Sequence, residues 1–446
     1  MTAETIFALA SGAGRAGVAV MRVSGPEAGA ALRAVAGRDL PAARRMMRVR
    51  LRDPKTGEAL DDGLAVWFPA PASFTGEDVV EFHIHGARTV IAALTTALGA
   101  LAGCRLAQPG EFTRRAFEAG KLDLTEAEGL ADLIDAETEA QRKQALRQMQ
   151  GELGRLYDDW RGRLIRALAH LEATIDFSDE ELPEGLLAGV RSDVAAVAAA
   201  MTSHLADGRR GERLRDGVHL AILGPPNAGK SSLLNMLARR EAAIVSDLAG
   251  TTRDVVEVYL DLGGYPLVVA DTAGLRAGGD AIEREGVRRA RLRAEDADLK
   301  LVVLDGGRWP AIDAEAATLI DARTLVAVNK IDLKRPPMDA TVGGHPIHAL
   351  SVKTGEGVDD LLKALATAVA ACCDVAGAPA LTRARHREAL EECRAGLRRY
   401  LDREGVGIEL AAEELRPAVR ALGRITGRVG VEDVLDVVFR DFCIGK

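Results

Sequence analysis

The sequence predicts a fold of mixed class, α/β plus all-α, in which a second α/β domain is inserted into a discontinuous helical domain. Three observations support this prediction. Short apolar runs bounded by Gly, Pro and Asp fill the beginning of the chain, strand-loop-helix alternation returns over 217–371, and helical spacing occupies both sides of that region. The predicted domains are 1–118 (α/β), 119–215 (first helical segment), 216–375 (inserted α/β) and 376–446 (second helical segment, with a Cys-Ile-Gly-Lys tail).

Composition limits the class of protein. The chain has 446 residues, a net charge of −8 and 4% aromatic residues, which argues against a protein that coats duplexes or stacks single strands. The opening "MTAETIFALASGAG" lacks the basic region and cleavage site of a signal peptide, and no apolar run reaches the ~18 residues of a membrane span. The five cysteines show no metal-ligand spacing. We therefore expect a cytoplasmic protein with reduced thiols.

The expected elements follow in order. In the first domain the predicted strands are "TIFALAS", "GVAVMRVSG", "MMRVRLRD", "GLAVWFP" and "DVVEFHIHG", and the predicted helices are "EAGAALRAVAG" and "ARTVIAALTTALGALAG". Residues 125–215 are expected to be helical with one short break, "DFSDEELPEGL". The basic stretch "RRGERLR" before Gly217 predicts a solvated hinge, and an RNA contact is the other interpretation.

The inserted domain carries a phosphate-binding motif. Its predicted strands are "HLAILG", "YPLVVAD", "LKLVVLD", "TLVAVNK" and "PIHAL", which predict a mostly parallel sheet. "GPPNAGKSS" (224–232) follows the first strand, opens a helix and matches G-x-x-x-x-G-K-[ST]. In this motif backbone N–H groups wrap the phosphates, Lys230 reaches the β- and γ-phosphates, and Ser231 binds Mg²⁺.

Three further motifs indicate guanine. "DTAGL" (271–275) ends a second strand and "NKID" (329–332) ends a third. Asp332 can accept from the N1–H and amine of guanine, whereas adenine would leave a buried carboxylate there unpaired. "SVKTGEG" (from Ser351) can supply a backbone N–H to the guanine carbonyl. The four motifs, in order, predict a Ras-like P-loop domain that binds GTP.

Hydrolysis needs groups beyond these motifs. Leu275 follows the Asp-x-x-Gly motif where many GTPases have a water-orienting Gln, and Thr252 of the switch segment "SDLAGTTRD" is expected to close on Mg²⁺. Asn227 together with "GTTRD" resembles the potassium-activated GTPases of the TrmE-Era-EngA type. The resemblance implies a K⁺ site made by Asn227, Ser246, Leu248 and Thr251.

The same resemblance implies that Glu283 orients the attacking water, although an isolated glutamate on such a segment is otherwise read as a solvated charge. Arg253 and Arg276 are alternative transition-state groups or surface ion pairs. The full predicted GTP-binding set is Asn227, Ala228, Gly229, Lys230, Ser231, Ser232, Ser246, Asp247, Leu248, Ala249, Gly250, Thr251, Thr252, Asp271, Thr272, Ala273, Gly274, Asn329, Lys330, Ile331, Asp332, Ser351, Val352 and Lys353.

The whole chain resembles the MnmE (TrmE) family, GTP hydrolases that modify the wobble uridine of certain tRNAs. The resemblance rests on "SFTGEDVVEFHIHG" (73–86), "QPGEFTRRAFEAGKLDLTEAEGLADLIDA" (108–136), the GTPase motifs and "FCIGK". Val352 and "HIHGA" depart from the usual pattern. The resemblance implies a homodimer that works with the flavin-dependent partner MnmG (GidA), in a heterotetramer, to install an aminomethyl-type (carboxymethylaminomethyl) group on C5.

The resemblance also implies that the first domain binds folate. The carbon donor would be 5-formyl- or 5,10-methylenetetrahydrofolate, contacted by Arg22, Glu81, Lys121 and Lys446. Arg22 and Lys121 paired with surface acids, and Glu81 on a solvent face, are the plainer alternatives. His83 and His85, two residues apart on one strand, could suggest a metal, but two ligands without a third favour a satisfied polar pair.

Cys443 has several possible roles. It is predicted to be a catalytic thiol in one-carbon transfer. A packing cysteine is the alternative, because Cys443 has no adjacent His base that would mark it as reactive. Two rival functions remain at this stage: a ribosome-assembly or stress-response switch without modification chemistry, and a folate enzyme that uses GTP as a regulator. The segments "GKLDL" and "FCIGK" favour modification, since a pure switch has no need of them.

Overall fold

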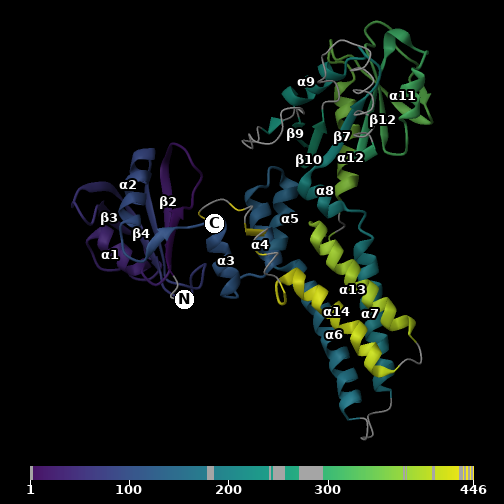
Figure 1. Cartoon of the computed structure of the whole chain (residues 1–446). Coiled ribbons are helices and arrows are strands. Elements are labelled where there is room, and N and C mark those ends of the chain that lie inside the picture. The colour runs from purple at the N-terminus through teal and green to yellow at the C-terminus, as the bar shows by residue number, and fades with distance from the viewer. Residues whose placement is uncertain are drawn as a thin grey trace, which may run out of the picture. The chain divides into compact units, whose positions relative to one another are not determined.

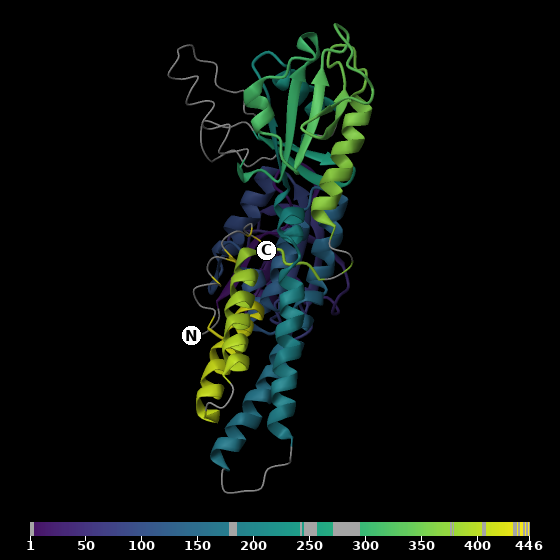
Figure 2. The same cartoon turned by 90° about the vertical axis from the view of Figure 1, so that its right-hand side faces the viewer.

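The computed structural model describes residues 4–177, 185–240, 243–244, 257–270, 295–374, 377, 379–403, 407–430, 435, 438–439, 442 and 445. The chain divides into two compact units. The first comprises residues 1–131, 157–161 and 419–446, and the second comprises residues 132–156 and 162–418. Figures 1 and 2 show the elements of both.

The first unit is built on a six-stranded sheet of order β3-β4-β5-β2-β1-β6, in which only β1 and β6 pair in parallel. Its strands are β1 (Thr5–Leu9), β2 (Ala16–Ser24), β3 (Met47–Arg52), β4 (Ala59–Phe68), β5 (Val79–Gly86) and β6 (Cys104–Leu106). All five expected strands are confirmed. The short β6 was not expected, because a strand of three residues leaves no alternation to detect.

Two helices cover one face of this sheet. Helices α1 (Ala28–Ala36) and α2 (Arg88–Gly99) share a core with Met21, Phe82 and other buried residues of the strands. On the opposite face, Ile6 and Ala8 pack with Phe112 of α3 (Glu111–Glu118) and with Phe74. Because alternate strand residues face opposite sides, Arg22 and Glu81 lie on this second face.

The second unit contains an eight-stranded sheet of order β13-β14-β12-β11-β7-β10-β9-β8. Its strands are β7 (Val218–Leu223), β8 (Ala243–Ile244), β9 (Glu257–Leu262), β10 (Tyr265–Ala270), β11 (Leu299–Asp305), β12 (Thr324–Asn329), β13 (Thr341–Val342) and β14 (His345–Ala349). Its central strands are parallel, as predicted, and are nearly all buried. Helices α9 (Lys230–Arg240) and α12 (Val358–Cys373) pack on one face and α11 (Ala314–Thr318) on the other.

Helices flank this sheet in the chain on both sides, as predicted. They are α4 (Leu124–Ile134), α5 (Glu139–Met149), α6 (Glu152–Asp176), α7 (Leu186–Leu205), α8 (Arg210–Asp216), α13 (Ala384–Asp402) and α14 (Ile408–Thr426). The expectation of one break before residue 215 was wrong. Thr138 forms a capping box that starts α5, and Gly151 adopts left-handed φ of 78° before α6.

Helix α7 is long and apolar enough, by length and composition alone, to cross a membrane. This differs from the expectation that no segment reaches that length. The helix carries Arg191 and Asp193, however, and its buried positions Val190, Val194 and Met201 recur at helical spacing. It packs beside α13 (Figures 1 and 2), so the apolar stripe belongs to a helical bundle.

The basic stretch before the inserted domain is not a solvated hinge. It forms α8, where Arg213 Nε pairs with Asp298 at 2.5 Å and Arg215 Nε pairs with Asp132 at 3.0 Å. Its arginines therefore fix the point at which the chain enters the inserted domain.

Candidate functional site

The phosphate-binding loop joins β7 to α9. Gly224 has φ of 133° and Gly229 has φ of 99°, and a Cβ at these positions would overlap Val303 O and Asn329 Nδ2 respectively. Both positions therefore require glycine. Lys230 Nζ lies across the loop and donates to Gly224 O at 2.7 Å and Pro225 O at 2.9 Å. The loop and the first turn of α9 form the concave set of backbone groups that binds phosphates.

Asn329 connects three of the predicted motifs. Its side chain is buried, its Nδ2 donates to Ala228 O at 2.9 Å, and its Oδ1 accepts from Val352 N at 3.0 Å. The motifs meet because β7, β11, β12 and β14 are parallel neighbours, which places their carboxyl ends at one edge of the sheet. Asn329 thus holds the phosphate loop and the guanine-side loop together.

Asp332, the side chain predicted to read guanine, follows β12 and is exposed rather than buried. Asp332 Oδ1 accepts from the buried Ser351 hydroxyl at 2.7 Å, which orients the carboxylate. The expectation of a buried carboxylate was wrong because the chain turns outward after β12. The Val352 N–H, expected to face the guanine carbonyl, donates to Asn329 here.

Sequence reasoning missed Asp305. Lys330, with φ of 66°, donates from Nζ to Asp305 Oδ2 at 2.7 Å. Partial burial raises the pKa of Asp305, but the hydrogen bonds from Lys330 and the Gly307 N–H outweigh it, so that pKa lies below its ordinary range. The sequence did contain a signal for Asp305. It is the last residue of an apolar strand, as Asn329 is the last residue of the neighbouring strand β12.

The other predicted nucleotide residues divide into two groups. Ala228 and Ile331 are buried, whereas Asn227, Ser231, Ser232 and Lys353 are exposed at the loop edges. The remaining predictions fall outside the described residues: Ser246, Asp247, Leu248, Ala249, Gly250, Thr251, Thr252, Asp271, Thr272, Ala273, Gly274 and Glu283.

A second candidate site lies on the face of the N-terminal sheet opposite α1 and α2, near Phe74 and Phe112. Residues 22 and 81 are direct partners in the β2–β5 register, and Arg22 donates to Glu81 Oε1 from Nε at 3.0 Å and from Nη2 at 2.9 Å. The Arg22 guanidinium lies 5.5 Å from the Phe74 ring centroid and 5.7 Å from that of Phe112. The two predicted residues thus bind each other within an aromatic setting that sequence reasoning missed.

Lys121 follows α3 and is exposed. Its Nζ donates to Pro71 O at 2.5 Å, on the loop that leads to Phe74. Pairing with an acid was the plainer alternative for both Arg22 and Lys121. Arg22 does pair with an acid, Glu81, whereas Lys121 donates to a backbone carbonyl.

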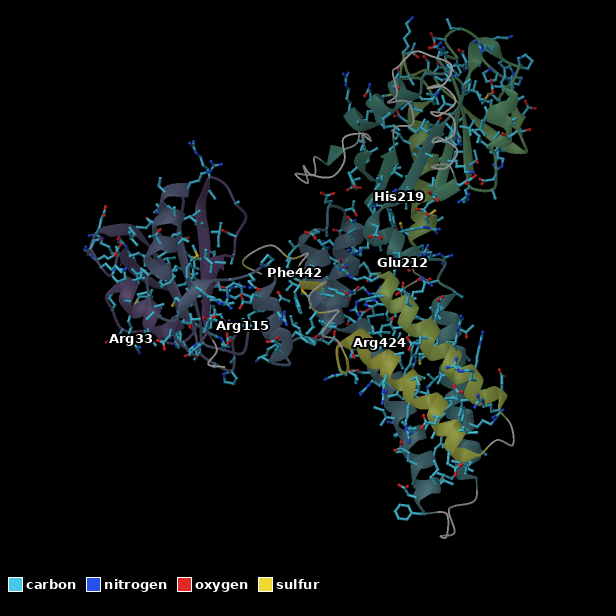
Figure 3. All side chains as sticks on the ribbon, in the orientation of Figure 1. Arg33, Arg115, Glu212, His219, Arg424 and Phe442 are labelled. Carbon is cyan, nitrogen blue, oxygen red and sulfur yellow. The ribbon has the colours of Figure 1, made fainter. Side chains whose placement is uncertain are left out.

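The C-terminal tail contacts the N-terminal sheet within the first unit. Phe442 is buried with Leu124 and Phe439 beside α4 (Figure 3). Gly445 has φ of 103°, and a Cβ there would overlap Leu9 O at the end of β1, so the two backbones are in close contact. Ala8, the residue before Leu9, pairs with Arg22 in the β1–β2 register. Cys443 and Lys446 themselves lie outside the described residues.

The four described cysteines are reduced and unsuited to nucleophilic chemistry. Burial raises the pKa of Cys373 and of Cys393 to about 12, and it also raises the pKa of Cys104 and Cys372. No group of three metal-ligating side chains occurs among the residues that the structure describes. His85 is satisfied by Asp61, with Nδ1 2.7 Å from Oδ1, whereas Nε2 of His83 has no hydrogen-bond partner in the part of the chain that the structure describes.

Taken with the parallel sheet, the linked motifs define a P-loop protein that binds guanine nucleotide. Comparison with known families identifies the family within this class. The description "GTP-binding protein TrmE N-terminus" matches residues 5–121, and "MnmE helical domain" matches residues 124–443. The chain belongs to the MnmE family of tRNA modification GTPases, and it is a GTPase that acts in tRNA modification.

Similar proteins cover the chain from end to end. The tRNA modification GTPase MnmE of Parvibaculum lavamentivorans is 61% identical over 445 residues, which is 99% of this chain and 100% of that protein. That of Rhodospirillum rubrum is 58% identical over 458 residues and covers 100% of both chains. A mitochondrial 5-taurinomethyluridine tRNA synthase subunit of Homo sapiens is 51% identical, over 99% of this chain and 93% of its own length.

Solved structures show a more distant likeness. The G domain of the T. maritima FeoB iron transporter matches 34% of this chain and 98% of its own, with 24% identity and a TM-score of 0.26. Aquifex aeolicus Era matches 43% of this chain and 69% of its own, with 23% identity and a TM-score of 0.26. At these values the likeness has no bearing on function.

Proposed function

We propose that this GTPase works with a flavin-dependent partner, MnmG (GidA), to add a carboxymethylaminomethyl-type group to C5 of the wobble uridine of certain tRNAs. A 5-formyl- or 5,10-methylenetetrahydrofolate supplies the carbon and the flavin supplies the redox chemistry. The chain acts in the cytoplasm as a homodimer, and with its partner as a heterotetramer. GTP hydrolysis drives a cycle of association and release of the GTP-binding domains.

One observation carries this proposal. The C-terminal tail reaches the end of β1, beside the strands that bear the Arg22–Glu81 pair. A GTPase that only switches between binding states has no need of a tail held against β1, the strand next to the one that bears Arg22. A folate-dependent transfer does need such a tail. Charged side chains recognise the carboxylates and the pterin amine of folate, and the tail contains Lys446 together with Cys443.

The nucleotide site fits the two cations that we propose. Ser231 is exposed in the first turn of α9, where its hydroxyl can join Mg²⁺, and Thr252 is the proposed second ligand. Asn227 is exposed in the phosphate loop with φ of 62°, which turns the chain sharply at the proposed K⁺ position. Ser246, Leu248 and Thr251 complete that proposed site, and Glu283 orients water. When bound, the cations neutralise charge that develops on the phosphates.

Nucleoside mass spectrometry of bulk tRNA tests the proposed function. In a strain that lacks the gene, C5-aminomethyl-type uridines should vanish, and the wild-type copy should restore them. A Glu81→Gln copy should fail to restore them while its GTP hydrolysis stays intact. Glu58→Gln, an exposed acid of the same domain, is the matched control and should restore them.

The tail is tested in the same strain. Cys443→Ser should leave GTP hydrolysis unchanged and abolish the modified nucleosides. Full modification by this variant would remove the covalent role of Cys443. An unchanged nucleoside profile in the strain without the gene would contradict the whole proposal.

A further inference from the structure

Among the residues that the structure describes, His83 has a ring nitrogen without a hydrogen-bond partner. It lies on β5, two residues after Glu81 and on the same face of the sheet, opposite Val20 of β2 and Leu64 of β4. Its Nε2 is buried and has no hydrogen-bond partner among the described residues. The nearby Glu81 Oε2 is 3.8 Å away, which is too far for a hydrogen bond. Buried polar atoms in native proteins are nearly always satisfied, so such an atom requires an explanation.

The neighbouring carboxylate has an unused oxygen as well. Both hydrogen bonds from Arg22 go to Glu81 Oε1, and within the described stretches of the chain Oε2 accepts none. The Arg22 guanidinium also contacts the rings of Phe74 and Phe112, and these contacts help to orient its partner Glu81. An acceptor, Oε2, and a ring nitrogen, Nε2, thus stand side by side on a rigid strand.

We propose that His83 is a ligand-binding residue of the tetrahydrofolate site, with Nε2–H donating to the 4-carbonyl of the pterin while Glu81 Oε2 accepts from the adjacent N–H. This inference rests on the proposed function. The lactam edge of a pterin offers a donor and an acceptor on adjoining atoms, which matches the acceptor and donor of the protein. The ring carries its proton on Nε2 in this arrangement.

The other histidine of the strand provides a contrast. His85 is exposed and its Nδ1 lies 2.7 Å from Asp61 Oδ1, so its hydrogen bonding is satisfied without a ligand. It therefore serves as a matched control from the same strand. An ion pair between His83 and Glu81 alone is the competing explanation. It predicts that His83→Ala leaves the preference between ligands that differ at the pterin 4-position unchanged, because Glu81 alone then sets that preference through the N3–H.

Isothermal titration calorimetry on the full-length protein separates these explanations. The probes are 5-formyltetrahydrofolate and its 4-amino-4-deoxy analogue, which lacks both the 4-carbonyl and the neighbouring N3–H. The wild type should prefer the 4-oxo ligand. In His83→Ala this preference should shrink about tenfold, the factor expected for loss of one hydrogen bond. His83→Gln, which keeps an N–H donor, should recover some of it, and His85→Ala should behave as wild type.

Each outcome decides the matter. If the preference is the same in His83→Ala as in the wild type, or if both ligands weaken equally with an unchanged ratio, the role of His83 is overturned and the folate site stands. If the wild type binds neither ligand while GTP hydrolysis is intact, the folate component of the proposed function fails together with the inference. Thermal unfolding of each variant shows whether it is folded, and His83→Gln provides a second test if His83→Ala is not.

Discussion

At the scale of single residues, the structure orients the side chain that we expect to read the base. Asp332 is oriented by the Ser351 hydroxyl, and Asn329 holds the loops around it. This support comes from residues buried at the edge of the sheet, so the exposed carboxylate is fixed without being buried itself. Lys330 is supported in a similar way, since its Nζ donates a hydrogen bond to Asp305 at the end of β11.

Asp332→Asn should change the preferred base. The amide presents a donor to the two donors of guanine, so GTP affinity should fall at least about 100-fold, because a polar site rejects a mismatched partner strongly. Xanthosine triphosphate, with a carbonyl in place of the amine, should gain affinity. Nucleotide titration measures both changes. GTP affinity equal to that of the wild type would contradict the role of Asp332.

At the scale of elements, one carboxylate ties both ends of the inserted domain to the helices. Asp132 of α4 accepts from Arg215 of α8 at 3.0 Å and from Arg383, just before α13, at 2.7 Å. Polar residues are the majority among those that line the adjoining cavity of about 100 Å³, and Gln141 Nε2 of α5 donates to Arg215 O at 2.9 Å. The chain therefore enters and leaves the sheet domain through one ionic junction.

Asp132→Ala should destabilise the second unit by about 1–3 kcal/mol, because it leaves two partly buried guanidinium groups without this carboxylate. The lower end of that range reflects solvent screening at Arg215. Asp216→Ala is the matched control. Asp216 also pairs with Arg215 but is exposed, so its loss should cost less than about 1 kcal/mol. Urea denaturation followed by circular dichroism measures both, and equal effects would count against the junction.

The helical bundle should lose stability in mild acid. Burial lowers the pKa of His204 in α7, Arg387 lowers it further, and Asp207 opposes them. The unfolded imidazole titrates near 6.5, so below that pH the unfolded state binds more protons than the folded state. Stability is therefore complete above pH 6.5 and falls as pH decreases toward the folded pKa.

His204→Gln should reduce this slope. It should not remove the slope, because burial also lowers the pKa of His348 in β14. Thermal unfolding midpoints measured between about pH 7.5 and 5.5 test this. A slope as steep in the variant as in the wild type would assign the acid sensitivity to other groups.

On the scale of the whole chain, the C-terminus is brought to the N-terminal sheet by close backbone contact at Gly445. Gly445→Ala should displace the tail, since a Cβ would overlap Leu9 O and φ of 103° disfavours any other residue. We expect faster carboxypeptidase trimming and loss of tRNA modification with normal GTP hydrolysis. Gly430→Ala introduces similar strain at φ of 59° but meets open space, so its tail should be trimmed at the wild-type rate.

Much of the architecture could be predicted because it is local. Apolar runs and helical spacing fix the elements, and the parallel order of β7, β11, β12 and β14 brings the motifs at their carboxyl ends together. The short edge strands β8 and β13, of two residues each, could not be predicted, because they are too short to show a pattern.

The sequence by itself determined the GTP-binding chemistry, since each motif is a short run whose function follows from its own backbone and side chains. The tertiary structure alone decided the second site. Arg22 and Glu81 are 59 residues apart and meet through the register of β2 and β5, and Gly445 meets Leu9 through the docking of the tail. The position of His83 Nε2, which has no hydrogen-bond partner among the described residues, follows from the same register, because hydrogen bonds between distant residues depend on packing that no local pattern encodes.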